Sequence, residues 1–86
     1  MSVYRIEITR DALRTLSKLD KPIRRRIEAA IDRLADDPRP AGVVAVKSMS
    51  GHLRMRVGDY RVIYEVQDHW LLVLIVECGH GREVYR

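Results

Sequence analysis

The stretch Leu53–Val66, which reads LRMRVGDYRVIYEV, alternates apolar and basic residues on both sides of a two-residue turn and decides the fold. The turn, Gly58-Asp59, begins with glycine, as type II′ hairpin loops do. A loop of two residues also sets the register, and it places Arg56 opposite Arg61. The sequence therefore predicts a β-hairpin with a defined pairing.

The two faces of this hairpin differ in chemistry, because residues paired across an antiparallel ladder point to the same side. One face is apolar and predicts a core surface made of Leu53, Met55, Val57, Tyr60, Val62 and Tyr64. The other face carries Arg54, Arg56 and Arg61, with Ile63 and Glu65 beside them. Like charges placed opposite each other are destabilising. An anion is therefore the expected partner of this second face.

The composition fits one soluble globular domain over residues 1–86, with 47% hydrophobic and 33% charged residues. The net charge is +4, and the sixteen basic residues are thirteen arginines and three lysines. Arginine binds phosphate or carboxylate oxygens in pairs, so the balance favours nucleic acid, an anionic membrane or an acidic protein as partner. A GC-rich genome would produce the same arginine bias.

The single cysteine, Cys78, excludes an internal disulfide and fits a reducing compartment. The N-terminus lacks the apolar centre of a signal peptide, and no segment approaches 18 consecutive apolar residues. We therefore expect a cytoplasmic protein that is not inserted in a membrane.

The segment before the hairpin predicts one strand and two helices. Val3–Ile8 alternates as a half-buried strand does. Thr9 and Asp20 are candidate N-caps, and the helix after each presents an apolar stripe at helical spacing. The first stripe is Leu13, Leu16 and Leu19, and the second is Ile23, Ile27, Ala30, Ile31 and Leu34. Asp37-Pro38 ends the second helix, because a residue before proline avoids the α conformation.

After the hairpin, Trp70–Val76 is apolar throughout and predicts a central strand covered on both faces. A short extended piece is expected at Val43–Lys47. The order strand, helix, helix and three strands indicates an α+β fold. A helical hairpin would pack on one mostly antiparallel sheet, formed by the N-terminal strand and a three-stranded antiparallel meander. The helices should cover the face of Met55, Val62 and Tyr64 and leave the arginines on the opposite side.

Other candidate sites are weaker. Cys78, His80, His69 and His52 lack the spacings of metal-binding motifs, so no metal or other cofactor is expected. Cys78 ends a buried strand and is interpreted as a packed residue rather than a nucleophile. The basic run Lys21, Arg24, Arg25 and Arg26 is interpreted as a solvated helix face, with a nucleic-acid contact as the alternative.

The arginines of the hairpin and a tail with Arg82, Tyr85 and Arg86 suit cleavage of RNA without a metal. In that chemistry the 2′-hydroxyl attacks the adjacent phosphorus, and cationic donors stabilise the charge of the phosphorane. Tyr85 could act as a base, because neighbouring arginines favour its ionised form, or it could stack on a nucleobase. From these residues alone, a basic face that only binds an acidic protein or a nucleic acid backbone is favoured over catalysis.

The chain resembles the RelE branch of the RelE/ParE toxin superfamily. The resemblance rests on three motifs, DPRPAG at residues 37–42, the stretch 53–66 and GHGREVYR at residues 79–86. It implies a microbial RNase-like fold and a ribosome-dependent mRNA endonuclease that cuts the codon in the A site and inhibits translation. The implied partners are a cognate antitoxin protein, the ribosome and mRNA, with no small-molecule cofactor.

Residue by residue, the resemblance implies a catalytic set at the positions that match the family motifs. That set is Arg54, Arg56, Arg61, Arg82 and Tyr85, with Lys47, His80 and Arg86 as further RNA-binding residues. Many members carry arginine where this chain has Gly81, and lysines where it has Arg54 and Arg56. The arginines remove a lysine base, which leaves Tyr85, His80 or the ribosome as the proton acceptor. The alternatives are a ParE-like inhibitor of DNA gyrase on the same fold, or a weakened toxin that only binds antitoxin or RNA.

Overall fold

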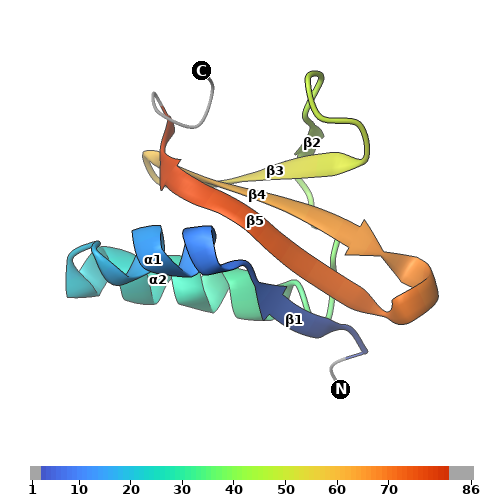
Figure 1. Ribbon diagram of the computed structural model, residues 1–86, viewed down its shortest axis with the longest axis horizontal. Coiled ribbons are helices and arrows are strands. Elements are labelled where there is room, and N and C mark those ends of the chain that lie inside the picture. The colour runs from blue at the N-terminus through green and yellow to red at the C-terminus, as the bar shows by residue number, and fades with distance from the viewer. Residues whose placement is uncertain (1–2, 82–86) are drawn as a thin grey trace.

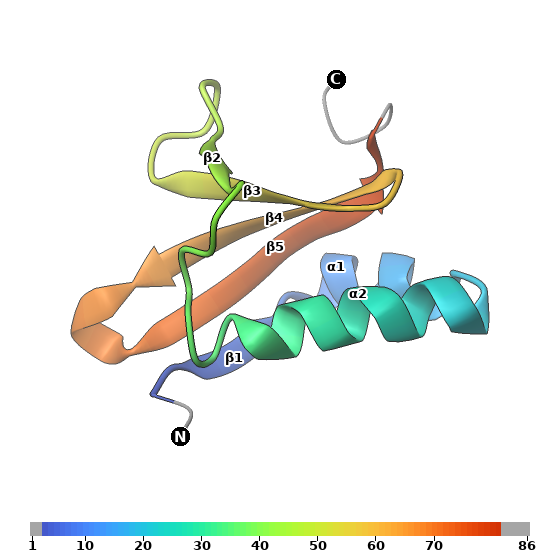
Figure 2. The same ribbon diagram turned by 180° about the vertical axis from the view of Figure 1, so that it is seen from behind.

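Two helices lie against one face of a mixed five-stranded sheet in the part of the chain that the computed structural model describes, residues 3–81 (Figures 1 and 2). The helices are α1 (Arg10–Ser17) and α2 (Lys21–Arg33), and the strands are β1 (Arg5–Ile8), β2 (Val44–Ala45), β3 (His52–Val57), β4 (Tyr60–Gln67) and β5 (Leu72–His80). The α+β prediction is confirmed.

The strand order is β1-β5-β4-β3-β2, so the first and last strands of the fold core are neighbours. β1 runs parallel to β5, and every other pairing is antiparallel. The short piece expected at Val43–Lys47 forms the edge strand β2, in which Val44 pairs with Arg54 and Ala45 with Leu53.

The register of the β3–β4 hairpin agrees with the prediction at each pair. Arg56 lies opposite Arg61, and Arg54 lies opposite Ile63. Gly58 has a φ of 60°. Asp59 does not share this positive φ, which is the combination that a type II′ turn requires.

The register between β4 and β5 shifts by one residue. Ile63 lies opposite Glu77, whereas the next residue, Tyr64, lies opposite Ile75. Val76 is therefore the extra residue of a β-bulge in β5. Beyond it, Val62 pairs with Cys78.

The helices cover one face of the sheet (Figure 1). The core lies between them and the strand face of Met55, Val62 and Tyr64, as predicted. Its buried members are Ala12, Leu16, Ile27, Ile31, Leu34, Met55, Val62, Tyr64, Val73, Ile75 and Cys78. Leu13 is 53% exposed, so its assignment to the buried stripe is wrong. Ala12 instead faces the core, together with Leu16 one turn later. Leu13 follows Ala12, and it is rotated by about 100° around the helix axis, away from the sheet.

The turn between β4 and β5 also differs from the prediction. Asp68–Trp70 forms a 3₁₀ turn, and Leu71 follows in the left-handed conformation with φ 50°. β5 therefore begins at Leu72 rather than Trp70, whose side chain is 67% exposed. The chain reverses direction sharply at this turn. The prediction placed Trp70 in the strand because its side chain is apolar.

Side-chain hydrogen bonds attach the loop after α2 to this turn. The Tyr4 hydroxyl donates to Asp68 Oδ1 at 2.6 Å, and both Arg39 Nη atoms donate to the Asp68 carboxylate at 3.1 and 2.8 Å. The buried Tyr64 hydroxyl donates to the Pro38 carbonyl at 2.7 Å. Hydrogen bonds from Arg39 and then Tyr4 lower the pKa of Asp68 to about 2.

Asp68→Asn should destabilise the fold near neutral pH and lose that effect in acid. The unfolded carboxyl titrates near pH ~3.9, above the folded value, so its contribution is present above pH ~4 and disappears as the pH falls toward 2. Urea unfolding of both proteins across this range measures the difference. The cluster is exposed, so salt should shrink the gap. A gap that persists unchanged at pH ~2 would contradict the ion-pair origin.

Candidate functional site

The sheet face opposite the helices carries Arg54, Arg56 and Arg61, and we call it the arginine face. Strand register alone brings them together: Arg56 pairs with Arg61, and Arg61 pairs in turn with Gly79 of β5. Arg56 and Arg61 lie in the half of the hairpin next to its turn, where the end of β5 also lies (Figure 1), and Arg54 belongs to the first pair beyond that half. The predicted cluster is therefore present in space.

Arg61 is half-buried, and its guanidinium rests against the chain at Gly81. Its Nη1 donates to the Tyr60 carbonyl at 3.2 Å. A Cβ atom built on Gly81 would lie 3.3 Å from Cζ of Arg61 and 3.5 Å from each Nη. These nearly equal distances mean that Gly81 lies over the flat side of the guanidinium, and the edges that carry the N–H donors are turned away from it.

Gly81 is itself held against the hairpin turn, because its amide donates to the Asp59 carbonyl at 3.0 Å. Arg82, Tyr85 and Arg86 lie outside the described residues.

Lys47 lies close to Arg54 because β2 pairs with β3. The two basic residues line an open hollow of about 440 Å³ together with Val44, Ala45, Val46 and Ser48. Arg56 is exposed, and its Nε donates to the Gly58 carbonyl at 3.1 Å. The basic surface thus runs from the hairpin turn to the edge strand.

His80 lies on the other side of the sheet. It pairs with Tyr60, and the two rings meet edge to face with centroids 5.6 Å apart. The structure therefore does not bring His80, an expected RNA-binding residue, together with the expected catalytic residues Arg54, Arg56 and Arg61.

Acidic residues limit the positive region of the arginine face. Glu65 lies opposite His52, with a 3.7 Å contact between their side chains, and Glu77 lies opposite Ile63. Ile63 is buried to 1% exposure although it belongs to this face. Its neighbours across the strands are the long chains of Arg54 and Glu77, whose stems can cover an apolar residue.

Tyr4, Tyr64 and Cys78 are poor proton acceptors. Burial raises the pKa of Tyr64 to about 12, and a hydrogen bond to Asp68 raises the pKa of Tyr4. Burial also raises the pKa of the Cys78 thiol, which donates to the Ala12 carbonyl at 3.3 Å. Cys78 is a packed residue, as the sequence indicated.

Arg26 of α2 also belongs to this end of the molecule, which the sequence interpretation of a solvated helix face missed. Its Nη2 lies 3.6 Å from the Cβ position of Gly58 in the hairpin turn. Arg26 directly precedes the buried Ile27, so it lies at the border of the apolar stripe. This position next to the apolar stripe was the signal in the sequence that Arg26 could lie close to the sheet.

Over residues 3–81, neither helix combines the length and the apolar character that a membrane-spanning helix requires. In the same range, no three His, Cys, Asp or Glu side chains gather as a metal site would require.

Comparison with known proteins gives the class of this small α+β domain with a basic sheet face. The model of the family described as ParE toxin of type II toxin-antitoxin system, parDE, matches residues 6–85. Toxin RelG of Mycobacterium tuberculosis is 30% identical over 84 residues, which cover 96% of this chain and 97% of that protein.

Solved structures give the same result. The archaeal RelE–RelB complex from Pyrococcus horikoshii OT3 contains a chain with a TM-score of 0.81 and 30% identity, covering 93% of this chain and 98% of that one. The RelBE2 complex from Mycobacterium tuberculosis matches with a TM-score of 0.80 and 27% identity, over 90% of this chain and 96% of that one. The protein belongs to the RelE/ParE superfamily and is a RelE-like toxin of the type II toxin–antitoxin class.

Proposed function

We propose that this toxin is a ribosome-dependent mRNA endonuclease that cuts the codon in the A site and so inhibits translation in the cytoplasm. The observation that carries the proposal is the gathering of Arg54, Arg56 and Arg61 on one open face next to the start of the tail. Three guanidinium groups at one end of a sheet suit a phosphodiester whose negative charge grows during the reaction.

In the proposed reaction, the 2′-hydroxyl oxygen of the mRNA attacks the adjacent phosphorus while its proton passes to a base. The bond from phosphorus to the 5′ oxygen breaks, and that oxygen takes up a proton. The products end in a 2′,3′-cyclic phosphate and a 5′-hydroxyl. The three arginines, with Arg82, donate to the phosphorane oxygens, and Tyr85 is the proposed base, because cationic neighbours favour its phenolate. No metal is needed for these steps.

Lys47 and Arg86 are proposed to bind the RNA backbone beside this site. A cognate antitoxin is proposed as the second partner, since the similar chains from Pyrococcus horikoshii and Mycobacterium tuberculosis were solved as toxin–antitoxin complexes. An acidic or amphipathic antitoxin helix could cover the arginine face or displace the tail with Tyr85. Either event would remove the site from RNA.

Translation of a defined mRNA on purified ribosomes tests the proposal. Added toxin should produce cuts at A-site codons, mapped by primer extension, with a 2′,3′-cyclic phosphate at the new 3′ ends. Intact mRNA together with inhibited DNA supercoiling by gyrase would instead establish the ParE-like alternative. A folded protein that binds RNA and leaves both targets unaffected would identify a weakened toxin.

Gly81→Ala should slow this cleavage roughly tenfold and leave the stability nearly unchanged. The new methyl group would lie 3.3 Å from Cζ of Arg61, so the guanidinium must move by a few tenths of an ångström. The group that moves is the end of a flexible side chain, so folding is little affected, whereas small misplacements of a catalytic group slow reactions. Single-turnover cleavage and urea unfolding measure the two effects. Equal cleavage rates would show that the position of Arg61 tolerates the methyl group.

A further inference from the structure

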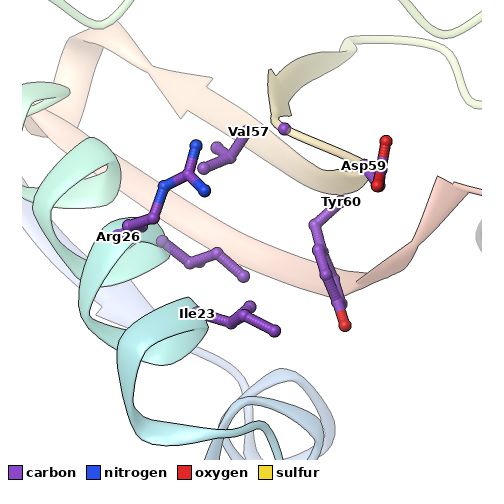
Figure 3. Close-up of a pocket in the computed structure, with 7 residues that line it drawn as sticks. Ile23, Arg26, Val57, Asp59 and Tyr60 are labelled. Atoms are coloured by element: carbon purple, nitrogen blue, oxygen red, sulfur yellow. The ribbon is translucent and has the colours of Figure 1, made fainter.

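A second hollow lies on the helix side of the hairpin turn, between α2 and the start of β4. It has a volume of about 230 Å³ and is lined by Ile23, Arg26, Ile27, Val57, Gly58, Asp59 and Tyr60. Figure 3 shows Arg26 and Tyr60 on opposite sides of this hollow, with Ile23 between them. The hollow thus combines an apolar floor, an aromatic wall and a cationic wall.

The cationic wall of the hollow is the side chain of Arg26. Arg26 is exposed, and among the described residues it makes no ion pair. Asp59 is the acidic residue of the lining, and its carboxylate lies on the far side of the turn from Arg26 (Figure 3). An anion that enters beside Arg26 would therefore meet the guanidinium before the carboxylate.

The aromatic wall is held in place by its neighbours. Tyr60 is half-buried, pairs with Val57 across the turn and meets the His80 ring edge to face at 5.6 Å. A ring fixed in this way can stack on a nucleobase with little loss of side-chain freedom.

This hollow is adjacent to the arginine face, because Tyr60 and Arg61 are consecutive residues whose side chains point to opposite sides of β4. Consecutive Cα atoms are about 3.8 Å apart. These first residues of β4 lie next to the hairpin turn, where Gly81 contacts Arg61 and its amide donates to the Asp59 carbonyl. An RNA chain bound at the arginine face can therefore pass around this end and reach the hollow.

We propose that the hollow is a second nucleotide-binding subsite, which holds a nucleotide flanking the one that is cut. Tyr60 would stack on the base, the floor of Ile23 and Ile27 would contact its edge, and Arg26 would bind a phosphate. The volume is below the about 300–1,000 Å³ of pockets for drug-sized ligands, so one planar base fits and the sugar and phosphate stay outside. This inference rests on the proposed function for the identity of the RNA as substrate.

The test uses the full-length toxin and a short single-stranded RNA oligonucleotide, with binding followed by amide chemical shifts in NMR titrations. RNA should shift the amides of Gly58, Asp59 and Tyr60. Arg26→Ala should weaken binding about fivefold to tenfold and reduce the slope of log K against log salt by about 0.7, which is one phosphate contact on a single strand.

Arg25→Ala is the matched control. It removes the same charge from the position that precedes Arg26 in α2. Arg25 lines a different hollow, with Leu13 and Glu28. Binding and salt slope should stay those of the wild type. Tyr60→Leu should weaken binding about tenfold by removing the stacking surface.

Shifts confined to the arginine face would overturn the inference, as would an absence of RNA binding or an equal loss in the Arg25 and Arg26 variants. Binding of an acidic peptide with no response to RNA would overturn it as well. Cleavage on ribosomes is scored separately, so wild-type cleavage without shifts at Gly58–Tyr60 leaves the proposed function intact. Shifts at the hollow in a toxin that cuts no mRNA would reject the proposed endonuclease and support the RNA subsite.

Discussion

Arg61→Ala should lower the rate of mRNA cleavage on ribosomes by about 10²–10³-fold, the usual effect of removing one positioned donor to a developing oxyanion. The reason lies in how Arg61 is held. Its guanidinium is fixed between the Tyr60 carbonyl and the flat contact with Gly81, so its remaining N–H groups are oriented before the substrate binds. Single-turnover cleavage on programmed ribosomes measures the effect.

The matched control is Arg25→Ala, which gives the same net charge and leaves the arginine face intact. Urea unfolding should show that Arg61→Ala remains folded, because Arg61 lies outside the core cluster. Arg61→Lys should recover only part of the rate, since an ammonium keeps the charge but not the two-pronged donor geometry. A rate for Arg61→Ala within a fewfold of the wild type would rule out the proposed role.

Tyr64→Ala should lower the free energy of unfolding by about 3–5 kcal/mol, the range for removing a large aromatic side chain from a core. Tyr64 is 0% exposed and packs among the residues of both helices and the sheet. Small domains have only about 5–15 kcal/mol of stability, so the variant should unfold at a much lower urea concentration.

Tyr64→Phe separates packing from hydrogen bonding. It keeps the ring and removes the donor to the Pro38 carbonyl, which should cost about 1–3 kcal/mol by leaving that acceptor unpaired. The loss of unfolding free energy in Tyr64→Phe should be the same at pH 5 and pH 8, because the raised pKa of Tyr64, about 12, keeps the wild-type hydroxyl protonated at both. Equal stabilities of Tyr64→Ala and Tyr64→Phe would contradict the packing argument.

The hairpin and its arginines were predictable because the information is local. Gly58-Asp59 specifies the turn, the turn specifies the register, and alternation then assigns Arg54, Arg56 and Arg61 to one face. The two helices followed from their apolar stripes for the same reason.

Other features depend on segments distant in sequence and could not be predicted in this way. The parallel pairing of β1 with β5 joins residues more than sixty positions apart. Burial of Ile63 depends on which long chains flank it across the strands. The position of Arg26 beside Gly58 depends on how α2 crosses the sheet. The roles of Arg82, Tyr85 and Arg86, and the extent of the domain over residues 1–86, stay predictions.

The extra residue Val76 in β5 determines which atoms surround Arg61. In an unbroken ladder, Arg61 would face Cys78, and Glu77 would be turned into the core against Val62, where an unpaired charge is costly. With the bulge, the thiol points inward and Gly79 lies opposite Arg61, with Gly81 two residues further along. Neither position 79 nor position 81 carries a side chain, so bare backbone borders the guanidinium there. One inserted residue in the last strand thus keeps the Cys78 thiol away from Arg61 and the Glu77 carboxylate out of the core.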